Sequence, residues 1–224
     1  MSDDSTKVLL IEDNPGDVRL IRELLKEAYG VSFSLECVDR LSAGLELLGQ
    51  GAIDIVLLDL GLPDSQGFDT FIRVHSSVPQ VPIVILSGLA DEALAAQAVR
   101  EGTQDYLIKG QVDSNLLGCS LRYAIERKQA EETLRQSEEN FRALAENASD
   151  GIIITSADGG IVYANKQASE ITGRTVDELV QTDTKKLAFP GRLQELVRRH
   201  KESWRENLGP AAMRLLLFRK MAES

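Results

Sequence analysis

The chain has few cysteines and no excess of basic residues, and both shortages limit the functions it can have. Only two cysteines, Cys37 and Cys119, occur in 224 residues, and their spacing matches no zinc or redox motif. Such usage is typical of a cytosolic chain whose thiols stay reduced. The 25 basic residues are outnumbered by 35 acidic ones, which gives a net charge of -10. We therefore expect no binding to nucleic acid or to anionic membrane surfaces.

Long apolar runs are also absent. Val81–Leu86 and Leu215–Phe218 are among the longest, and both are far shorter than the roughly 20 residues that a membrane-spanning helix needs. The first residues, Met1–Asp4, are acidic and polar, which is unlike a secretory signal peptide. The sequence thus predicts a cytoplasmic protein without membrane segments.

The first half of the chain alternates short apolar runs with helical patterns. Five runs predict buried strands, at 7–11, 33–38, 53–58, 81–86 and 105–108. Apolar residues at helical spacing follow them, as Val18, Ile21 and Leu25 do after the first run. After the fourth run, residues 94–99 predict a helix with a face of small residues that ends at Gly102. Five such units in order predict a parallel sheet covered by helices on both faces.

A long, highly charged helix is predicted after this alternation ends near Asp113. Neither glycine nor proline interrupts residues 122–146. Apolar or small residues recur there at alternating spacings of four and three, a coiled-coil seam made of Ala130, Leu134, Ser137, Phe141, Leu144 and Ala148. Both a solvated single helix and a parallel homodimer through residues 122–148 agree with this pattern.

Polar side chains follow four of the predicted strands at the point where each strand ends. They are Glu12, Asp13, Asp59, Ser87 and Lys109. Because functional groups of a parallel doubly wound sheet gather at the carboxyl ends of its strands, we expect these five to meet. Clustered carboxylates repel one another unless a cation neutralises them, and hard oxygen ligands suit Mg²⁺. This set predicts phosphoryl transfer to Asp59. We interpret Asp17 and Asp64 as a first-turn helix residue and a turn residue.

Four motifs carry a resemblance to a known family; they are Leu10–Asn14, Leu57–Asp64, Ile85–Gly88 and Asp105–Lys109. With them, residues 7–122 resemble the receiver domain of two-component response regulators. The resemblance implies a flavodoxin-like (βα)5 fold, a doubly wound parallel sheet with strand order 2-1-3-4-5. It also implies that Asp59 is the phosphoacceptor. Mg²⁺ would be held by Glu12, Asp13, Asp59 and the backbone carbonyl of Gly61.

The same resemblance implies a conformational switch. Ser87 would move toward the phosphoryl group while Tyr106 turns inward. Lys109 would offset charge on the phosphoryl oxygens, and Gly88 would leave room for the phosphodonor. Gly110 departs from the family pattern, because proline commonly stands after the lysine.

The last part of the chain has a different pattern. Residues 151–155 and 161–163 flank a turn and predict a hairpin, followed by short helices at 166–172 and 176–181. A longer helix is predicted from an apolar face made of Leu193, Leu196, Val197, His200 and Trp204. The segments Phe141–Asn147, Asp150–Ile154, Asp158–Asn165 and Ile171–Thr175 resemble a PAS sensor module, which implies a five-stranded antiparallel sheet with helices over one face. Residues 213–218 would supply its third strand.

The PAS resemblance also sets expectations for completeness and cofactors. The family's last two strands lie between the third strand and the first hairpin, and we expect this partial α+β module to lack them and to have a gap. We do not expect flavin, because the flavin-photoreceptor members need a reactive cysteine and this module has none. We do not expect haem either. His200 is the one histidine in the module, and its place on an apolar face favours a core role over ligation.

These observations predict three parts: a receiver domain at 1–125, a helical linker at 126–146 and an incomplete PAS domain at 147–224. We expect a phosphorelay response regulator that accepts a phosphoryl group from a histidine kinase or phosphotransfer protein and relays it through the helix to the PAS module. We expect no enzyme activity beyond phosphorylation and dephosphorylation of its own aspartate. Gly61 stands where aspartate-nucleophile phosphatases carry a second aspartate. The alternatives are a dimerising scaffold, or the N-terminal fragment of a hybrid sensor kinase or cyclase.

Overall fold

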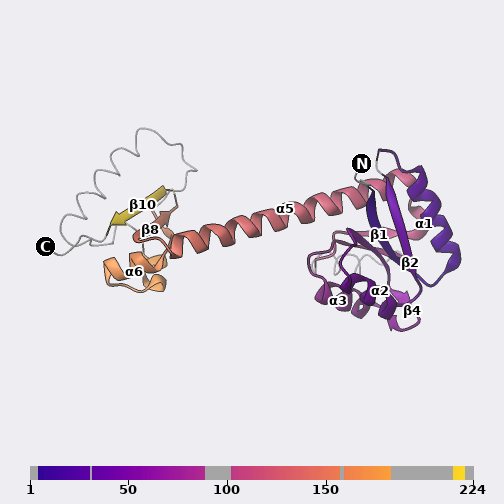
Figure 1. Ribbon diagram of the computed structural model, residues 1–224, viewed down its shortest axis with the longest axis horizontal. Helices are drawn as coiled ribbons and strands as arrows, with labels where there is room; N and C mark the ends of the chain where they lie inside the picture. The colour runs from indigo at the N-terminus through magenta and orange to yellow at the C-terminus, as the bar shows by residue number, and fades with distance from the viewer. Residues whose placement is uncertain (1–4, 31, 89–101, 157–158, 183–213, 220–224) are drawn as a thin grey trace. The chain divides into compact units, whose positions relative to one another are not determined.

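The computed structural model describes residues 5–30, 32–88, 102–156 and 159–182, together with the backbone of 214–219. The chain divides into two compact units, Met1–Leu134 and Arg135–Ser224. Figure 1 shows the secondary structure of both. Among the described residues, no helix combines the length and apolar character that crossing a bilayer requires.

The first unit is built on a sheet of five parallel strands (Figure 1). The strands are β1 (Thr6–Ile11), β2 (Phe33–Val38), β3 (Ile55–Asp59), β6 (Ile83–Ser87) and β7 (Asp105–Ile108). They lie in the order β2-β1-β3-β6-β7, and every neighbouring pair is parallel. In sequence order this is 2-1-3-4-5, the order of flavodoxin-like folds, so the predicted fold class is confirmed.

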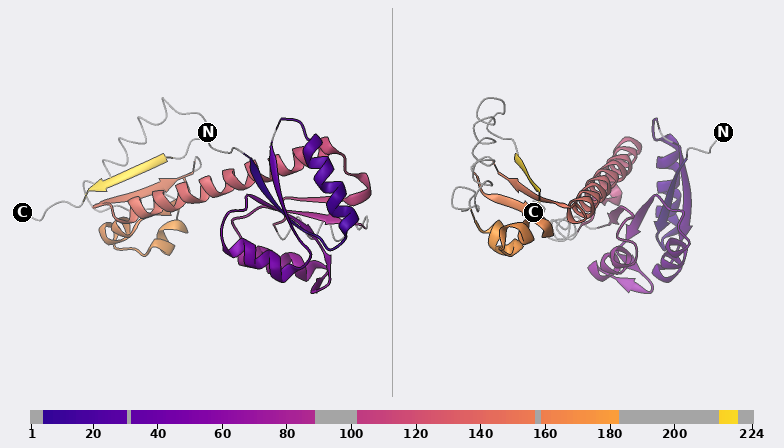
Figure 2. Two further views of the ribbon diagram at one scale, coloured as in Figure 1. Left: turned by 45° about the vertical axis from the view of Figure 1, so that its right-hand side comes forward. Right: turned by 60° about the vertical axis from the view of Figure 1, so that its left-hand side comes forward.

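Helices cover both faces of this sheet, as the alternating pattern predicted (Figure 2). On one face, α2 (Leu41–Gly49) and α3 (Phe68–Ser77) bury Leu41, Leu48 and Phe71 against the strands. On the other face, α1 (Pro15–Glu27) and the start of α5 (Ser114–Glu146) bury a second apolar cluster that includes Ile21 and Leu117. Two small strands, β4 (Gly61–Leu62) and β5 (Ser65–Gln66), pair after β3. The helix predicted at 94–99 lies outside the described residues.

Two strands begin later than the apolar runs suggested. The third and fourth strands were expected from Ile53 and Val81, whereas β3 begins at Ile55 and β6 at Ile83. Asp54 precedes β3 and turns its carboxylate back to accept a hydrogen bond from the Lys7 backbone N–H at 2.7 Å. Pro82 precedes β6 and has no N–H to donate to a neighbouring strand.

Helix α5 is a single element of 33 residues, as predicted. It begins after Asp113, whose side chain accepts a hydrogen bond from the Leu116 N–H at 2.8 Å. Leu117 and Leu121 are buried in the first unit, whereas residues 129–144 are all exposed. Ion pairs four residues apart, such as Arg127 with Glu131 at 3.1 Å, support this exposed stretch.

The second unit contains an antiparallel sheet and two short helices. Its strands are β8 (Asp150–Thr155), β9 (Ile161–Ala164) and β10 (Arg214–Arg219), in the order β10-β8-β9. Helices α6 (Lys166–Thr172) and α7 (Val176–Val180) follow the hairpin within a residue of the predicted bounds. Gly151 lies against α6, because a Cβ at this position would come within 3.0 Å of the Ala168 Cα. The predicted helix that carries His200 lies outside the described residues.

One prediction about this sheet is wrong. We expected a gap between the strand at 213–218 and the hairpin, but β10 pairs directly with β8 along its whole length, from Arg214 opposite Thr155 to Arg219 opposite Asp150. The physical reason is that the open edge of β8 exposes backbone N–H and C=O groups, and pairing with β10 satisfies them. The described part of the module is therefore a continuous three-stranded sheet.

Candidate functional site

Three carboxylates converge at the carboxyl edge of the parallel sheet. Glu12 and Asp13 follow β1, and Asp59 is the last residue of β3. Because β1 and β3 are neighbours and Ile11 lies opposite Leu58, these strand ends lie beside each other. One carboxylate oxygen from each of the three residues lies within 4.8 Å of the other two. Glu12 is buried, Asp59 is half-buried and Asp13 is exposed.

Lys109 brings a positive charge to this cluster. It follows β7 and begins the 3-10 turn η1 (Lys109–Gln111). Its Nζ lies 2.5 Å from Glu12 Oε2, 3.0 Å from Asp17 Oδ2 and 3.3 Å from Asp59 Oδ1. Burial alone would lower the pKa of Lys109, but these carboxylates outweigh it, so that the pKa lies above its ordinary value. The ammonium is therefore charged at neutral pH.

Glu12 is the most buried member of the cluster. Burial raises the pKa of Glu12 above its ordinary value, although the Lys109 ammonium and the Asn14 N–H oppose this effect. Its Oε1 accepts a hydrogen bond from Asn14 N at 3.0 Å. The other oxygen, Oε2, is buried and makes no hydrogen bond of regular geometry with the described residues. It forms an ion pair with the Lys109 ammonium instead.

The arrangement fits a divalent cation with hard character. Three carboxylates from Glu12, Asp13 and Asp59 supply oxygen ligands from one side, and Asp13 opens the site to solvent. Such a set suits Mg²⁺, because this ion generally takes a few carboxylates and keeps several of its waters. Gly61 borders the same carboxylate, since a Cβ at this position would lie 3.5 Å from Asp59 Oδ2. These four residues could hold the ion.

The other predicted residues lie on the neighbouring strands. Ser87 ends β6 one residue beyond Leu86, the partner of Asp59 in the sheet, and its side chain is buried. Tyr106 lies on β7 and is half-buried, packed against the apolar cluster beneath α2 and α3. Gly88 is exposed, and a Cβ there would meet nothing within 4 Å. The described residues therefore leave space for a side chain at Gly88.

Two acidic residues have contacts that the sequence did not indicate. Asp17 lies in the first turn of α1, as expected, but its carboxylate also binds Lys109. Asp64 lies in the turn after β4, and its two oxygens accept hydrogen bonds from the N–H groups of Leu41 and Ser42, both at 2.9 Å. These two bonds lower the pKa of Asp64 to about 2. Asp64 therefore caps the start of α2.

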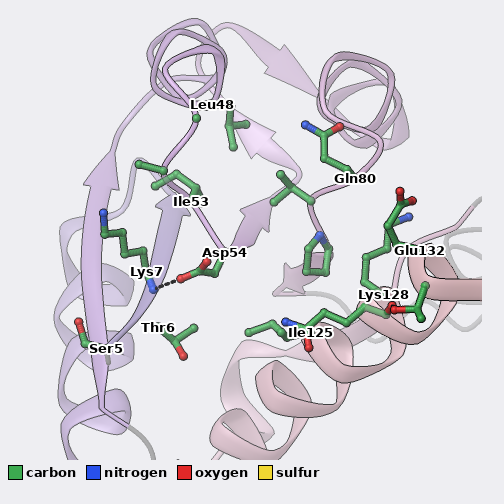
Figure 3. A pocket seen from close by; sticks show the side chains of 16 residues that line it. Ser5, Thr6, Lys7, Leu48, Ile53, Asp54, Gln80, Ile125, Lys128 and Glu132 are labelled. Atoms are coloured by element: carbon green, nitrogen blue, oxygen red, sulfur yellow. Dashed lines mark hydrogen bonds between the residues drawn. The ribbon is translucent and has the colours of Figure 1, made fainter. Parts of the chain in front are cut away.

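A cavity in the first unit lies elsewhere. It is a groove of about 1150 Å³ at the amino ends of the strands, lined by Lys7 and Asp54 on the sheet side and by Ile125, Lys128 and Glu132 of α5. Figure 3 shows these α5 side chains across the groove from the sheet. Since the acidic cluster lies at the carboxyl ends of the same strands, this groove is not part of that site.

A doubly wound parallel sheet with strand order 2-1-3-4-5 defines the flavodoxin-like class of α/β proteins, and here its carboxyl edge carries three carboxylates and a lysine. The family model "Response regulator receiver domain" matches residues 8–119, and a PAS domain model matches residues 139–209. The first match covers half of the 224 residues, and the chain belongs to the response regulator receiver domain family. A PAS domain follows the receiver domain, as the sequence predicted.

Two curated proteins are similar to large parts of this chain. The chain is 26% identical to the sensor histidine kinase TmoS of Ectopseudomonas mendocina, over 88% of this chain and 23% of the kinase. It is 24% identical to the response regulator protein TodT of Pseudomonas putida, over 65% of this chain and 64% of that protein. The chain thus spans from about a quarter to under two thirds of the length of these curated relatives.

Solved structures resemble the first unit. The signal receiver domain of an HD domain-containing protein from Pseudomonas fluorescens Pf-5 matches with a TM-score of 0.51 and 25% identity, over 59% of this chain and 96% of that one. The receiver domain of a Luxo repressor homologue from Vibrio parahaemolyticus matches with the same TM-score at 21% identity, over 58% of this chain and 97% of that one. The second likeness concerns the fold alone.

Proposed function

We propose that the chain works in phosphorelay signalling and accepts a phosphoryl group on Asp59 from a phosphohistidine of a histidine kinase or phosphotransfer protein. The observation that supports this best is the position of the Asp59 carboxylate. It lies 3.3 Å from the Lys109 ammonium and within 4.8 Å of the carboxylates of Glu12 and Asp13. The relatives named as a sensor histidine kinase and a response regulator agree with such a role.

The transfer is a displacement at phosphorus. An oxygen of the Asp59 carboxylate forms a bond to phosphorus as the phosphorus–nitrogen bond of the donor histidine breaks. The imidazole nitrogen leaves with the electron pair of that bond and takes up a proton from solvent. Because such a transition state is loose, the site contributes mainly by holding the groups in line and offsetting their charge. Gly88 would leave room for the donor, since a Cβ there would meet no described atom within 4 Å.

Each side chain of the site has a distinct proposed role. Mg²⁺, held by Glu12, Asp13, Asp59 and the Gly61 carbonyl, would supply positive charge beside the phosphoryl oxygens when it is bound. The Lys109 ammonium offsets charge on the same oxygens from the side of β7.

Ser87 and Tyr106 form the proposed switch. The Ser87 hydroxyl donates a hydrogen bond to a phosphoryl oxygen after it moves toward Asp59. The half-buried Tyr106 ring turns inward into the space that Ser87 leaves. The chain itself would perform no chemistry beyond phosphorylation and dephosphorylation of its own aspartate.

The proposed path from the receiver domain (1–125) to the PAS module (147–224) is the helical linker at 126–146. Within the second unit, the last turn of α5 is tied to the module. Asn165 Nδ2 donates to the Ala145 carbonyl at 2.7 Å. The Glu146 carboxylate accepts from Tyr163 Oη at 2.8 Å and from Lys166 N at 2.9 Å. A displacement of the helix would therefore reach β9 and the start of α6.

The test is phosphorylation of the full chain by phosphoramidate and Mg²⁺, followed by intact-protein mass spectrometry. We expect an added phosphoryl group on the natural chain and none on Asp59→Asn. The matched control is Asp54→Asn, at the opposite end of the same strand, where a carboxamide can still accept the Lys7 N–H. Retained phosphorylation of Asp59→Asn, or equal loss in Asp54→Asn, would contradict the assignment. Removing Mg²⁺ with a chelator should slow phosphorylation by about tenfold or more, because metal ions offset the charge of the phosphoryl oxygens.

A second candidate function is homodimerisation through α5, which its exposed seam favours. Leu134 and Leu144 have exposed fractions of 62% and 75%. Leu134 follows Ile125 by nine residues, and at about 100° per residue the two lie on opposite faces of the helix. Ile125 packs against the apolar cluster of the first unit that includes Ile21 and Leu117. The helix face that carries Leu134 therefore points away from this cluster. A second α5 with the same spacing would cover this face.

Light scattering on the full chain tests the dimer. We expect Leu134→Asp to lower the measured mass from that of a dimer to that of a monomer. A dimer would bury the new carboxylate in the seam, and removing an unpaired charge from water is unfavourable. Gln136→Asp is the matched control, since it adds the same charge to an exposed position off the seam. A monomeric natural chain with and without phosphodonor would exclude this candidate.

The match to TmoS favours a further possibility, in which the receiver and PAS domains act as part of a larger sensor kinase. The alignment takes in 88% of this chain. The test is to sequence the transcript that encodes Ser224 and read its frame onward. A kinase domain in that frame would support this role, and a stop codon directly after Ser224 would refute it.

A further inference from the structure

The Lys109 ammonium is held by one carboxylate that does not belong to the metal-binding group. Its Nζ donates a hydrogen bond to Asp17 Oδ2 at 3.0 Å. Both side chains are largely shielded from solvent, with exposed fractions of 14% for Lys109 and 27% for Asp17. Asp17 comes from the first turn of α1, which begins at Pro15 after the Asn14 side chain accepts the Gly16 N–H. The backbone that carries the carboxylate is therefore held by a capped helix.

The other two carboxylates at Lys109 have competing roles. Glu12 and Asp59 are both members of the group that fits a divalent cation, and Asp59 is also the proposed phosphoacceptor. Once a cation and a phosphoryl group engage those oxygens, their hold on the ammonium weakens. Asp17 lies outside this group, so its bond to Lys109 can persist in the loaded site.

An ammonium has three N–H donors that rotate together about the Cε–Nζ bond until a hydrogen bond holds one of them. A persistent bond to Asp17 uses one of them and leaves the others aimed toward the strand ends, where Asp59 lies. Without that bond, the long lysine side chain would be free to sample other rotamers, which is entropically favoured. The charge on Asp17 would then be less important than the direction it gives to Lys109.

We propose that Asp17 is a positioning residue that aims the Lys109 ammonium at the phosphoryl oxygens on Asp59. This inference rests on the proposed phosphorylation of Asp59. The competing explanation is that Asp17 only stabilises α1, since an acidic residue in a first helical turn interacts favourably with the helix dipole. Activity alone does not separate the two, so the test needs readouts that helix stability would not change.

The first measurement is the rate of phosphorylation by phosphoramidate at saturating Mg²⁺. We expect Asp17→Ala to slow it by about tenfold, because a hydrogen bond to a charged group is lost. Asp17→Asn keeps an oxygen acceptor of the same shape, and we expect it to restore most of the rate, to within about threefold of the natural chain. The control is Glu23→Ala on the same helix, where the carboxylate contacts exposed Lys26 and the same charge is removed. We expect no change there.

The second measurement is a double-mutant cycle with Lys109→Ala. If Asp17 acts through Lys109, then Asp17→Ala should have no further effect on the rate in that background. The third is nuclear magnetic resonance of ¹⁵N-labelled lysine in Mg²⁺-saturated protein, where the cation would engage Glu12 and Asp59; it needs no activity. The order parameter of the Lys109 ammonium should fall in Asp17→Ala and stay unchanged in Glu23→Ala.

The outcomes separate this inference from the proposed function. If the natural chain is not phosphorylated on Asp59, both are overturned. If it is phosphorylated but Asp17→Ala behaves like Glu23→Ala in rate and order parameter, the positioning role alone is overturned. An Asp17→Ala effect that persists in full in the Lys109→Ala background would also overturn it. If Asp17→Ala does not fold, the isosteric Asp17→Asn variant decides the matter. A low order parameter of the Lys109 ammonium in that variant would contradict positioning by the side-chain oxygen.

Discussion

Replacing Asn165 by alanine should selectively destabilise the second unit. The Asn165 side chain is fully buried and makes four hydrogen bonds. Its Nδ2 donates to the carbonyls of Ala145 at 2.7 Å and Asp150 at 3.0 Å. Its Oδ1 accepts from the N–H groups of Ile152 at 2.8 Å and Ala168 at 2.9 Å. One side chain thus joins the end of α5, the strand β8 and the start of α6.

The expected loss follows from these contacts. A hydrogen bond contributes about 1 kcal/mol net, and an unpaired buried group costs about as much again. Asn165 is also the N-cap of α6, a role worth about 1 kcal/mol. Because some of the freed groups will regain water, we expect the alanine variant to lose about 3–5 kcal/mol of unfolding free energy in the second unit.

Hydrogen exchange measured residue by residue is the appropriate assay. The amide protons of Ile152 and Ala168 should exchange faster by a factor of about 100 or more, since about 1.4 kcal/mol corresponds to tenfold. Amides of the first unit, such as Leu57, should keep their protection. Asn140→Ala serves as the control, because Asn140 is exposed and makes one side-chain contact with Gln136. Unchanged protection at Ile152 and Ala168 would refute the reasoning.

Three further predictions concern other parts of the chain. Because the pKa of Asp64 is lowered from 3.8 to about 2, its contribution to stability is present above pH 3.8 and is lost as the pH falls toward 2; urea midpoints of natural protein and Asp64→Ala should converge there. Phe71→Ala should cost the first unit about 3–5 kcal/mol, because Phe71 is fully buried, and thermal unfolding should report it. Burial and the Glu146 hydrogen bond raise the pKa of Tyr163 to about 12. Its contribution is therefore complete below pH 10 and is lost as the pH rises from 10 through about 12, and ultraviolet titration that shows ordinary Tyr163 ionisation would contradict this.

The parallel sheet could be predicted because its strands are short apolar runs with distinct ends. Leu57 and Ile85, for example, lie in runs that have to be buried on both faces, and such strands occur in parallel sheets. The residue after each run then falls at the carboxyl edge, which is why Glu12 and Asp59 could be placed together before the fold was known. The roles of these side chains stay predictions.

Other features depend on contacts between residues far apart in the sequence. Nothing in the local pattern around Asp17 distinguishes a helix-dipole residue from a partner of Lys109, since 92 positions separate the two. The same holds for Asp64, which caps a helix that begins 23 residues earlier. The position of β10 beside β8 was mispredicted because it depends on which edge is left open, and periodicity carries no information about that.

The continuity of α5 restricts how the length of this chain can vary. Leu121 at one end and Ala145 at the other are both buried, each in its own unit. Every residue added to or removed from the exposed stretch between them turns the downstream part by about 100° about the helix axis and shifts it by about 1.5 Å. Seven residues come close to two full turns. Functional relatives should therefore differ here by whole heptads, and a one-residue deletion near Gln136 should uncouple the two ends although it removes no contact in either core.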